Sequence, residues 1–158
     1  MLQNVSIALL LIKIKRMKKI MLLLGLFAGA CFTISAQKLA AAKVPAAAMT
    51  SFAKQYPGVA GKWEKEAGKY EVNFTQKGIA MSVLMDEKGR IAETEMGLKI
   101  SDLPTSVLAY VKQHYSGKII KEGAKITKAD GTVNYEAEVS GKDVIFDSNG
   151  KFLKEVKD

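Results

Sequence analysis

The sequence has very few of the residues on which most enzyme chemistry depends: one cysteine, one histidine and one tryptophan among 158 residues. The cysteine, Cys31, lies in an apolar N-terminal stretch, so the chain after it has no disulfide and no cysteine nucleophile. The histidine, His114, is predicted on the solvent side of a helix, and no Gly-x-Ser-x-Gly turn occurs. We therefore predict a protein that is not an enzyme, with no catalytic residues and no cofactor.

A strong charge of one sign is also lacking once the N-terminus is set aside. The chain has 24 basic and 16 acidic residues, a formal net charge of +8. The basic residues of segment 1–36 are Lys13, Lys15, Arg16, Lys18 and Lys19, and this segment has no acid. Residues 37–158 thus keep 19 basic against 16 acidic residues, a net of +3. A small surplus, interspersed with acids, indicates a soluble surface, and we expect no nucleic-acid partner.

The N-terminus has the pattern of an export signal. A short positive region, Met17-Lys18-Lys19, precedes the apolar stretch 20–34, and Ser35-Ala36 supplies small residues before Gln37. The apolar stretch is shorter than the ~20 residues that span a membrane. We predict that residues 1–36 form a signal peptide, that no membrane span remains after cleavage, and that the protein is periplasmic or secreted.

Two alternatives concern this N-terminal segment. Residues 1–16 are either an upstream extension that precedes the true start at Met17 or part of a longer signal with a divided apolar region. Cys31 is either a residue of the apolar signal core, which we favour, or a lipidation site. The sequence Ala28-Gly29-Ala30-Cys31 resembles a lipobox but lacks the usual leucine three residues before the cysteine.

The rest of the chain contains one motif twice. Residues 44–58 return without a gap as residues 103–117, with matching apolar-Pro pairs, tyrosines and glycines. Each copy continues with a Tyr-Glu pair and an Asp-x-x-Gly-basic turn, at 70–71 and 86–90 and again at 135–136 and 147–151. Internal repetition defines the unit of architecture. We predict two homologous units, residues 44–97 and 101–157.

Each copy begins with a helix. Met49, Phe52, Ala53 and Tyr56 follow helical spacing and predict one apolar face, which Leu108, Val111 and Tyr115 repeat in the second copy. Proline opens both helices, and Pro57-Gly58 ends the first. Ser101 or Asp102 is expected to cap the second helix. The Ala/Lys-rich segment 38–43 is expected to be a frayed leader or the first helical turns.

The segments that follow the helices alternate between apolar and polar residues. Tyr70, Val72 and Phe74 point to one side of a strand, while Glu71, Asn73 and Thr75 point to the other. Gly-containing turns separate the strands, and Asp130-Gly131 and Asn149-Gly150 are strong hairpin signals. A period of two with one polar side is typical of an antiparallel sheet covered on one face. We predict an α+β fold of two tandem units, each about αββββ, that form one sheet with both helices on one face.

This layout resembles the PepSY-like family of small exported bacterial proteins, whose tandem helix-plus-sheet units are similar to those of the β-lactamase inhibitor protein. The resemblance covers nearly all of residues 44–157. It rests on the two helix openings, the segments 54–58 and 69–72, and the hairpin turns 86–90 and 147–151. It implies a binding module in the envelope or outside the cell, with inhibition of a peptidase or another enzyme among the expected roles. It brings no catalytic residues with it.

Three residue groups merit a chemical interpretation. The carboxylate pairs Glu93/Glu95 and Glu136/Glu138 each share a strand face, but among Lys and Thr we expect a solvated surface, not an acid–base pair. The run that starts at Asp147 resembles the opening of a calcium loop, yet no bidentate Glu follows, so we predict a β-turn and no metal site. The predicted partner-binding residues are Trp63, Glu71, Asn73, Thr75, Glu136 and Glu138.

The leading functional hypothesis is an exported binding module whose open sheet face binds another envelope or secreted protein, as an inhibitor in its most specific form. The alternative is a carrier that holds a small ligand or peptide in a crevice between the two units. In that case Trp63 and Tyr70 are expected to stack on the ligand.

Overall fold

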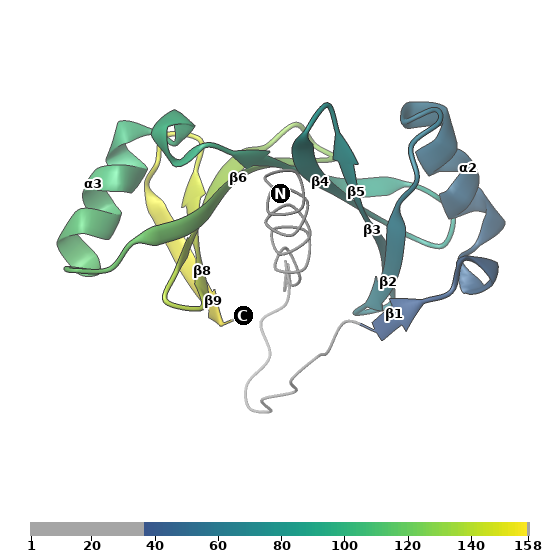
Figure 1. Cartoon of the computed structure of the whole chain (residues 1–158), viewed down its shortest axis with the longest axis horizontal. Helices are drawn as coiled ribbons and strands as arrows, with labels where there is room; N and C mark the ends of the chain where they lie inside the picture. The colour runs from purple at the N-terminus through teal and green to yellow at the C-terminus, as the bar shows by residue number, and fades with distance from the viewer. Residues whose placement is uncertain (1–36, 158) are drawn as a thin grey trace, which may run out of the picture.

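The computed structural model describes residues 37–157, which form one antiparallel sheet of nine strands and two α-helices (Figure 1). The strands follow each other in the sheet in chain order, β1 to β9. The predicted α+β fold with tandem helix-then-strands units is therefore confirmed. The elements are β1 Gln37–Leu39, the 3-10 helix η1 Ala41–Lys43, α2 Ala46–Gln55, β2 Lys62–Glu66, β3 Lys69–Gln76, β4 Ile79–Met85, β5 Ile91–Leu98, the 3-10 helix η2 Ile100–Asp102, α3 Thr105–His114, β6 Ile120–Lys128, β7 Val133–Val139, β8 Lys142–Asp147 and β9 Phe152–Lys157.

Glycine-containing turns connect most neighbouring strands, as the sequence predicts. In three two-residue turns both residues have positive φ, and the first of them is Ala67, Lys77 or Ser140. This conformation matches the right-handed twist of the flanking strands. The wider turns at Gly89, Gly131 and Gly150 place only the glycine at positive φ. These short connections make each strand pair with its successor within a unit, whereas β1 and β2, and likewise β5 and β6, pair across a connection that contains a helix.

Both helices begin directly after a proline and end one residue before a buried or half-buried tyrosine. Pro45 and Pro104 occupy the N-cap positions, and no side chain caps either helix. The expectation that Ser101 or Asp102 caps the second helix is wrong, because both residues lie in η2. The proline itself fixes the extended backbone that leads into each helix. The first helix ends at Gln55, and Gly58 then adopts a φ of +76°.

The buried face of each helix agrees only in part with the predicted one. Ala48 and Phe52 face the sheet on α2, whereas Met49 and Ala53 are exposed. On α3 the corresponding residues are Val107 and Val111, and Leu108 is only half-buried. The small side chain of Ala48, which has no exposed surface, lets the helix approach the sheet closely. The prediction of Met49 and Ala53 as core residues was therefore wrong, whereas that of Phe52 and Tyr56 is confirmed.

The segment after residue 36 is a strand and not the start of a helix. Residues Gln37–Leu39 form β1, which pairs antiparallel with β2, with Leu39 opposite Trp63. A short 3-10 turn, η1, then leads to Val44. The prediction of a frayed leader or helical turns is wrong because the edge of β2 supplies hydrogen-bond partners that no local pattern reveals. The predicted signal peptide, residues 1–36, lies outside the described residues.

Each unit has its own hydrophobic core between its helix and its strands. In the first, Phe52 packs edge-on against Trp63 and Phe74, with ring centroids 5.7 and 5.1 Å apart. In the second, Val107 and Val111 pack with Phe146 and other apolar residues of β7 and β8. Burial of one large apolar side chain contributes about 1.5–3 kcal/mol. The core of each unit therefore fixes its helix on the same side of the common sheet.

A hairpin turn of each unit packs against the start of its own helix. A Cβ atom built on Gly89 would lie 2.5 Å from the carbonyl oxygen of Ala47, so the β4–β5 turn contacts the backbone of α2. In the second unit, a Cβ atom built on Gly150 of the β8–β9 turn would collide with the side chain of Ser106, whose hydroxyl donates a 2.9 Å hydrogen bond to the Asn149 carbonyl. The same kind of contact, between a hairpin turn and the start of a helix, therefore positions the helix in each unit.

Candidate functional site

The sheet is arched, and both helices lie on the outside of the arch (Figure 1). We call the side of the sheet that neither α2 nor α3 covers the open face. Its members follow from the strand register, because residues directly opposite each other point to the same side. One row across the open face contains Asn73, Ser82, Glu95, Ile126 and Asn134, from β3 to β7.

Carboxylates are concentrated on this open face. Glu64 lies opposite Glu71, and Glu122 lies opposite Glu138, which lies opposite Asp143. The register places on this face Glu64, Glu71, Glu93, Glu95, Glu122, Glu136, Glu138, Asp143 and, at the end of β8, Asp147. This segregation is hidden in the sequence, where the same residues alternate with lysines and apolar residues.

The structure brings most of the predicted binding residues onto one surface. Glu71, Asn73 and Thr75 lie on β3, and Glu136 and Glu138 lie on β7, all on the open face. Strands β4, β5 and β6 separate the two groups. The open face is therefore continuous across both units.

Trp63 lies on the other side of the sheet. It is 7% exposed and belongs to the first core, where it contacts Phe52. Tyr70 belongs to the same core and is 9% exposed. Neither ring can stack on a ligand in a crevice between the units without opening this core. The two aromatic rings that the carrier hypothesis needs for stacking on a ligand are therefore already packed in the core.

Glu95 is the residue that the sequence interpretation missed. The expectation for Glu93, Glu95, Glu136 and Glu138 was a solvated surface, and it was wrong, because each of them is buried, with Glu95 at 5% exposure. Burial, and then the nearby carboxylates Glu136 and Glu71 and further acids of the same face, raise the pKa of Glu95 well above its usual range. Within residues 37–157, its Oε2 atom has no hydrogen-bond partner.

The neighbouring Glu93 has a different environment. Burial raises its pKa, but the lysine side chains of Lys128, Lys69 and Lys154 act in the opposite direction. Glu138, farther along the face, accepts a hydrogen bond from the Lys121 ammonium at 3.1 Å. Lysines therefore offset the charge of Glu93 and Glu138 on the open face, whereas every charged residue named above as acting on Glu95 is acidic.

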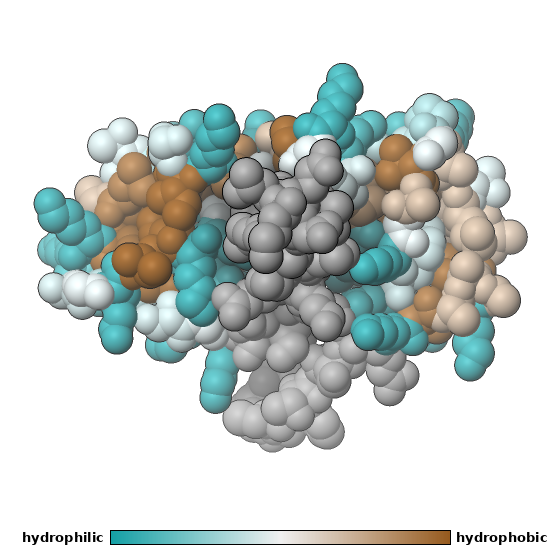
Figure 2. Space-filling model, viewed as in Figure 1, coloured by the Kyte–Doolittle hydropathy of each residue, from teal (hydrophilic) through white to brown (hydrophobic). Residues whose placement is uncertain are grey.

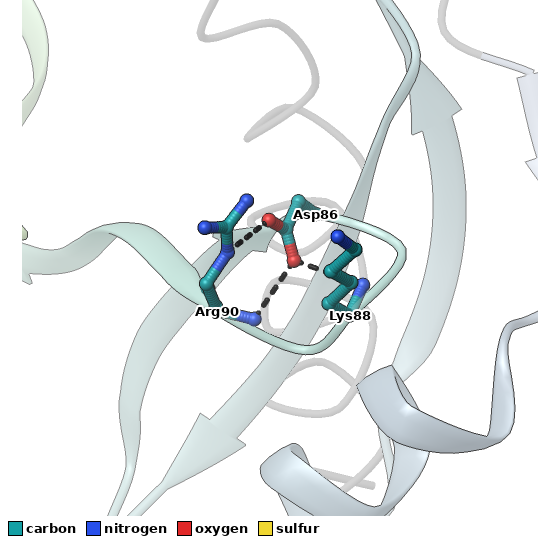
Figure 3. A network of polar contacts seen from close by, with 3 residues as sticks. All are labelled: Asp86, Lys88 and Arg90. Carbon is teal, nitrogen blue, oxygen red and sulfur yellow. Dashed lines mark hydrogen bonds and ion pairs between the residues drawn. The ribbon is translucent and has the colours of Figure 1, made fainter.

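The Asp-x-x-Gly turns are closed by their own backbone. Asp86 Oδ1 accepts hydrogen bonds from the Lys88 and Arg90 amides, each 2.9 Å long, and its Oδ2 pairs with the Arg90 guanidinium at 2.6 Å (Figure 3). Asp147 Oδ1 accepts from the Asn149 and Lys151 amides in the same way. The described residues contain no group of three or more His, Cys, Asp or Glu side chains arranged for a metal ion. The β-turn interpretation accounts for these aspartates.

Two further features of the surface are the histidine and the exposed apolar side chains. His114 is exposed at the end of α3, where its ring stacks on Tyr110 at a centroid distance of 4.1 Å. Figure 2 shows hydrophobic surface over each unit, and it extends between α3 and the last strands on the left. Large exposed hydrophobic side chains occur in both units: Met49, Ile79, Ile100, Ile119 and Leu153.

A family model whose description reads "Putative beta-lactamase-inhibitor-like, PepSY-like" matches residues 32–93 and 68–154 of the sequence. The chain belongs to the PepSY-like family. The predicted resemblance is thereby confirmed. The family is named as inhibitor-like, and this description indicates no enzyme activity. No protein with a curated description matches the sequence.

Solved structures of similar architecture come from Bacteroides species. A protein of Bacteroides eggerthii described as "putative periplasmic" has a TM-score of 0.65 at 14% identity and covers 72% of this chain and 88% of its own. A DUF2874 family protein of Bacteroides ovatus has a TM-score of 0.60 at 22% identity and covers 71% and 86%. These two likenesses show the fold alone.

A third similar structure adds a functional description. A BLIP-like protein of Bacteroides fragilis has a TM-score of 0.56 at 25% identity and covers 70% of this chain and 83% of its own. The PepSY-like chain described here is thus similar to proteins named for inhibition and for the periplasm. Among its residues 37–157, no helix is long and apolar enough to cross a membrane.

Proposed function

We propose that this PepSY-like protein is an exported, non-enzymatic binding module and that its open face binds another envelope or secreted protein. The observation that carries the proposal is the one-sided covering of the sheet. Both helices occupy the outside of the arch, and the polar residues of both units gather on the inside. Both units then contribute to one surface, which explains why the repeat is useful for binding.

The proposed contacts are the open-face residues Glu71, Asn73, Thr75, Glu136 and Glu138. Trp63, which was also predicted from the sequence, lies in the first core on the other side of the sheet and supports this surface only through the packing of β2 and β3. Polar groups on a concave surface favour specificity and fast association over raw affinity. We assign the helix-plus-strand units to residues 44–97 and 101–157, and the export signal to residues 1–36.

Inhibition of an envelope enzyme is the specific form of binding that we propose. The inhibitor-like description of the family and the similarity to a BLIP-like protein support it. The periplasmic descriptions of similar structures support the proposed compartment. In this proposal the partner enzyme inserts a protruding segment into the arch, and the bound module blocks access to its active site.

The test is an affinity capture from envelope and secreted fractions of the cells that make the protein. Three baits of residues 37–158 are compared: the unchanged sequence, an open-face variant with Glu71→Ala, Asn73→Ala and Glu136→Ala, and a control variant with Glu87→Ala and Asp102→Ala. Glu87 and Asp102 are exposed and lie in turns away from the open face. We expect one protein to be enriched by the unchanged and control baits and lost from the open-face bait.

The enriched protein is then assayed for its own activity with increasing amounts of the module. Inhibition is supported if the activity of the captured protein falls in proportion to the fraction of it that is bound to the module. A partner that the open-face variant retains contradicts the proposed binding surface. Full activity in the saturated complex contradicts inhibition but leaves the binding module in place.

A further inference from the structure

Glu95 differs from several other acids of the chain. Asp86 and Asp147 each accept two backbone hydrogen bonds within their turns. Glu155 pairs with Lys142, at the edge of the sheet. These acids thus have partners that stabilise their charge at short range.

The Oε2 atom of Glu95 has no such partner among residues 37–157. Glu95 lies on β5, the middle strand of the nine, opposite Ser82 on one side and Ile126 on the other. The residue is only 5% exposed. An uncompensated carboxylate at a buried position destabilises a protein. A group of this kind at the centre of a candidate binding surface indicates that its charge is compensated by a ligand.

The charges around Glu95 indicate the sign of that ligand. Glu71 lies on β3, Glu136 on β7 and Asp143 on β8, and each of these carboxylates acts on Glu95 in the same unfavourable direction. These acids belong to both units, so residues that are far apart in the sequence act on the same carboxyl group. When a concave surface with low-dielectric walls is lined by charges of one sign, their electrostatic potential adds up. Such a surface attracts a cation more strongly than a flat surface does.

The arrangement favours an organic cation over a metal ion. In residues 37–157, no three potential metal ligands converge on a common point. A metal ion needs several oxygens at about 2.0–2.6 Å, whereas a guanidinium or ammonium side chain pairs with carboxylates that are spread over a larger surface. The partner chemistry that fits is therefore a segment of protein with several arginine or lysine side chains.

We propose that the open face binds a basic, protruding segment of the partner protein and that an arginine or lysine of this segment pairs with Glu95. This inference rests on the proposed function and specifies the partner of the same face. It explains why residues 37–158, which have a small net positive charge, concentrate carboxylates on this one surface. Lysines also lie on this face, among them Lys62 opposite Asn73 and Lys128 opposite Glu93, but the residues opposite Glu95 itself are Ser82 and Ile126.

The probe for this inference is a fluorescein-labelled octa-arginine peptide, with octa-glutamate as its charge-reversed counterpart. The protein is residues 37–158, because every described helix, strand and core residue lies within 37–157. Binding is followed by fluorescence anisotropy at about 0.15 M and at about 1 M salt, where the screening length falls from about 8 to about 3 Å. We expect octa-arginine to bind at the lower salt and octa-glutamate not to bind.

Two variants with the same charge change locate the binding site. Glu95→Gln removes the central charge, and Glu87→Gln removes a charge from an exposed turn outside the open face. We expect Glu95→Gln to raise the Kd about tenfold, in line with close charge pairs at interfaces, and Glu87→Gln to leave it within twofold. Glu95→Gln also relieves like-charge repulsion, so its thermal stability is expected to equal or exceed that of the unchanged protein. Misfolding then cannot explain weaker binding.

Equal Kd values for the two variants, or no binding of octa-arginine at the lower salt, overturn the basic-segment inference. These outcomes are distinguishable from failure of the proposed function. If affinity capture finds a partner that depends on the open face while octa-arginine does not bind, the binding module stands and only the chemistry of its partner is wrong.

Discussion

Two glycines in identical turns offer a sharp test of how the helices are positioned. In both turns the glycine amide donates to a carbonyl three residues earlier, Gly89 to Asp86 and Gly131 to Lys128, each at 3.0 Å. Their φ angles are +75° and +83°. Their surroundings differ, because a Cβ on Gly89 would lie 2.5 Å from the Ala47 carbonyl oxygen, whereas a Cβ on Gly131 would have no atom within 4 Å.

The substitutions Gly131→Ala and Gly89→Ala therefore separate backbone strain from packing. An alanine at positive φ costs about 1 kcal/mol, which is the whole expected effect at Gly131. At Gly89 the methyl group also collides with the backbone of α2, which cannot rotate away, and such overpacking adds about 1–3 kcal/mol. We expect a loss of about 1 kcal/mol for Gly131→Ala and about 3 kcal/mol for Gly89→Ala.

Urea denaturation followed by circular dichroism measures both free energies of unfolding. For a domain of this size, 1 kcal/mol corresponds to about 4 °C in Tm, so the two variants are expected to differ by about 8 °C. Equal losses for the two variants would refute the inference that the β4–β5 turn packs against the start of α2.

Three further predictions concern side chains. Burial and neighbouring carboxylates raise the pKa of Glu95, so its ionisation opposes folding. The resulting loss of folding stability is absent below the unfolded-state pKa of Glu95 and grows as the pH rises through its folded-state pKa. Glu95→Gln should therefore stabilise the protein by about 1 kcal/mol near pH 8 and less near pH 5, in urea denaturation at both pH values; equal gains at both would contradict this pKa shift. Trp63→Ala should cost about 3–5 kcal/mol, because it leaves a cavity in the first core, whereas Leu153→Ala at an exposed edge should cost less than about 0.5 kcal/mol; comparable losses in denaturation curves would place Trp63 outside the core. Burial and a hydrogen bond to Glu155 raise the pKa of Tyr115 to about 12, so its ring Cζ NMR signal should remain unshifted up to about pH 11, and a midpoint near 10 would refute that bond.

Several features of the fold follow from local sequence signals. The turns at Lys77-Gly78 and Asn149-Gly150 are recognisable because glycine adopts positive φ without cost. The alternation in β3 assigns Glu71 and Asn73 to the face opposite Val72, and the repeat places the second helix by analogy with the first. These signals depend only on residues close to each other in the chain.

Other features depend on contacts between distant segments. Strand β1, residues Gln37–Leu39, has no strand pattern of its own and forms because the edge of β2 is available. The choice of Ala48 over Met49 as the inward residue depends on where the sheet meets the helix, which a difference of one residue in helical phase decides. Spacing alone predicts an apolar stripe but not its exact centre.

The candidate site is predictable in outline but not in its electrostatics. The alternation in β5 places Glu95 on a polar strand face, next to Glu93, and by itself indicates solvent. Its raised pKa depends on its burial and on carboxylates of distant strands, among them Glu136 and Asp143 of the second unit, which act on a strand of the first. No pattern in a single strand contains this information, because it depends on the whole sheet.

Photo-crosslinking in living cells tests the central claim, that the open face is the binding surface, and it needs no purified partner. A benzophenone amino acid is placed at Thr75 on the open face or at Met49, which is 40% exposed on the outer side of α2. After irradiation, adducts in envelope fractions are detected by immunoblotting and identified by mass spectrometry. We expect a discrete adduct with a second protein from Thr75 and none from Met49. An adduct from Met49, with none from Thr75, would contradict this claim.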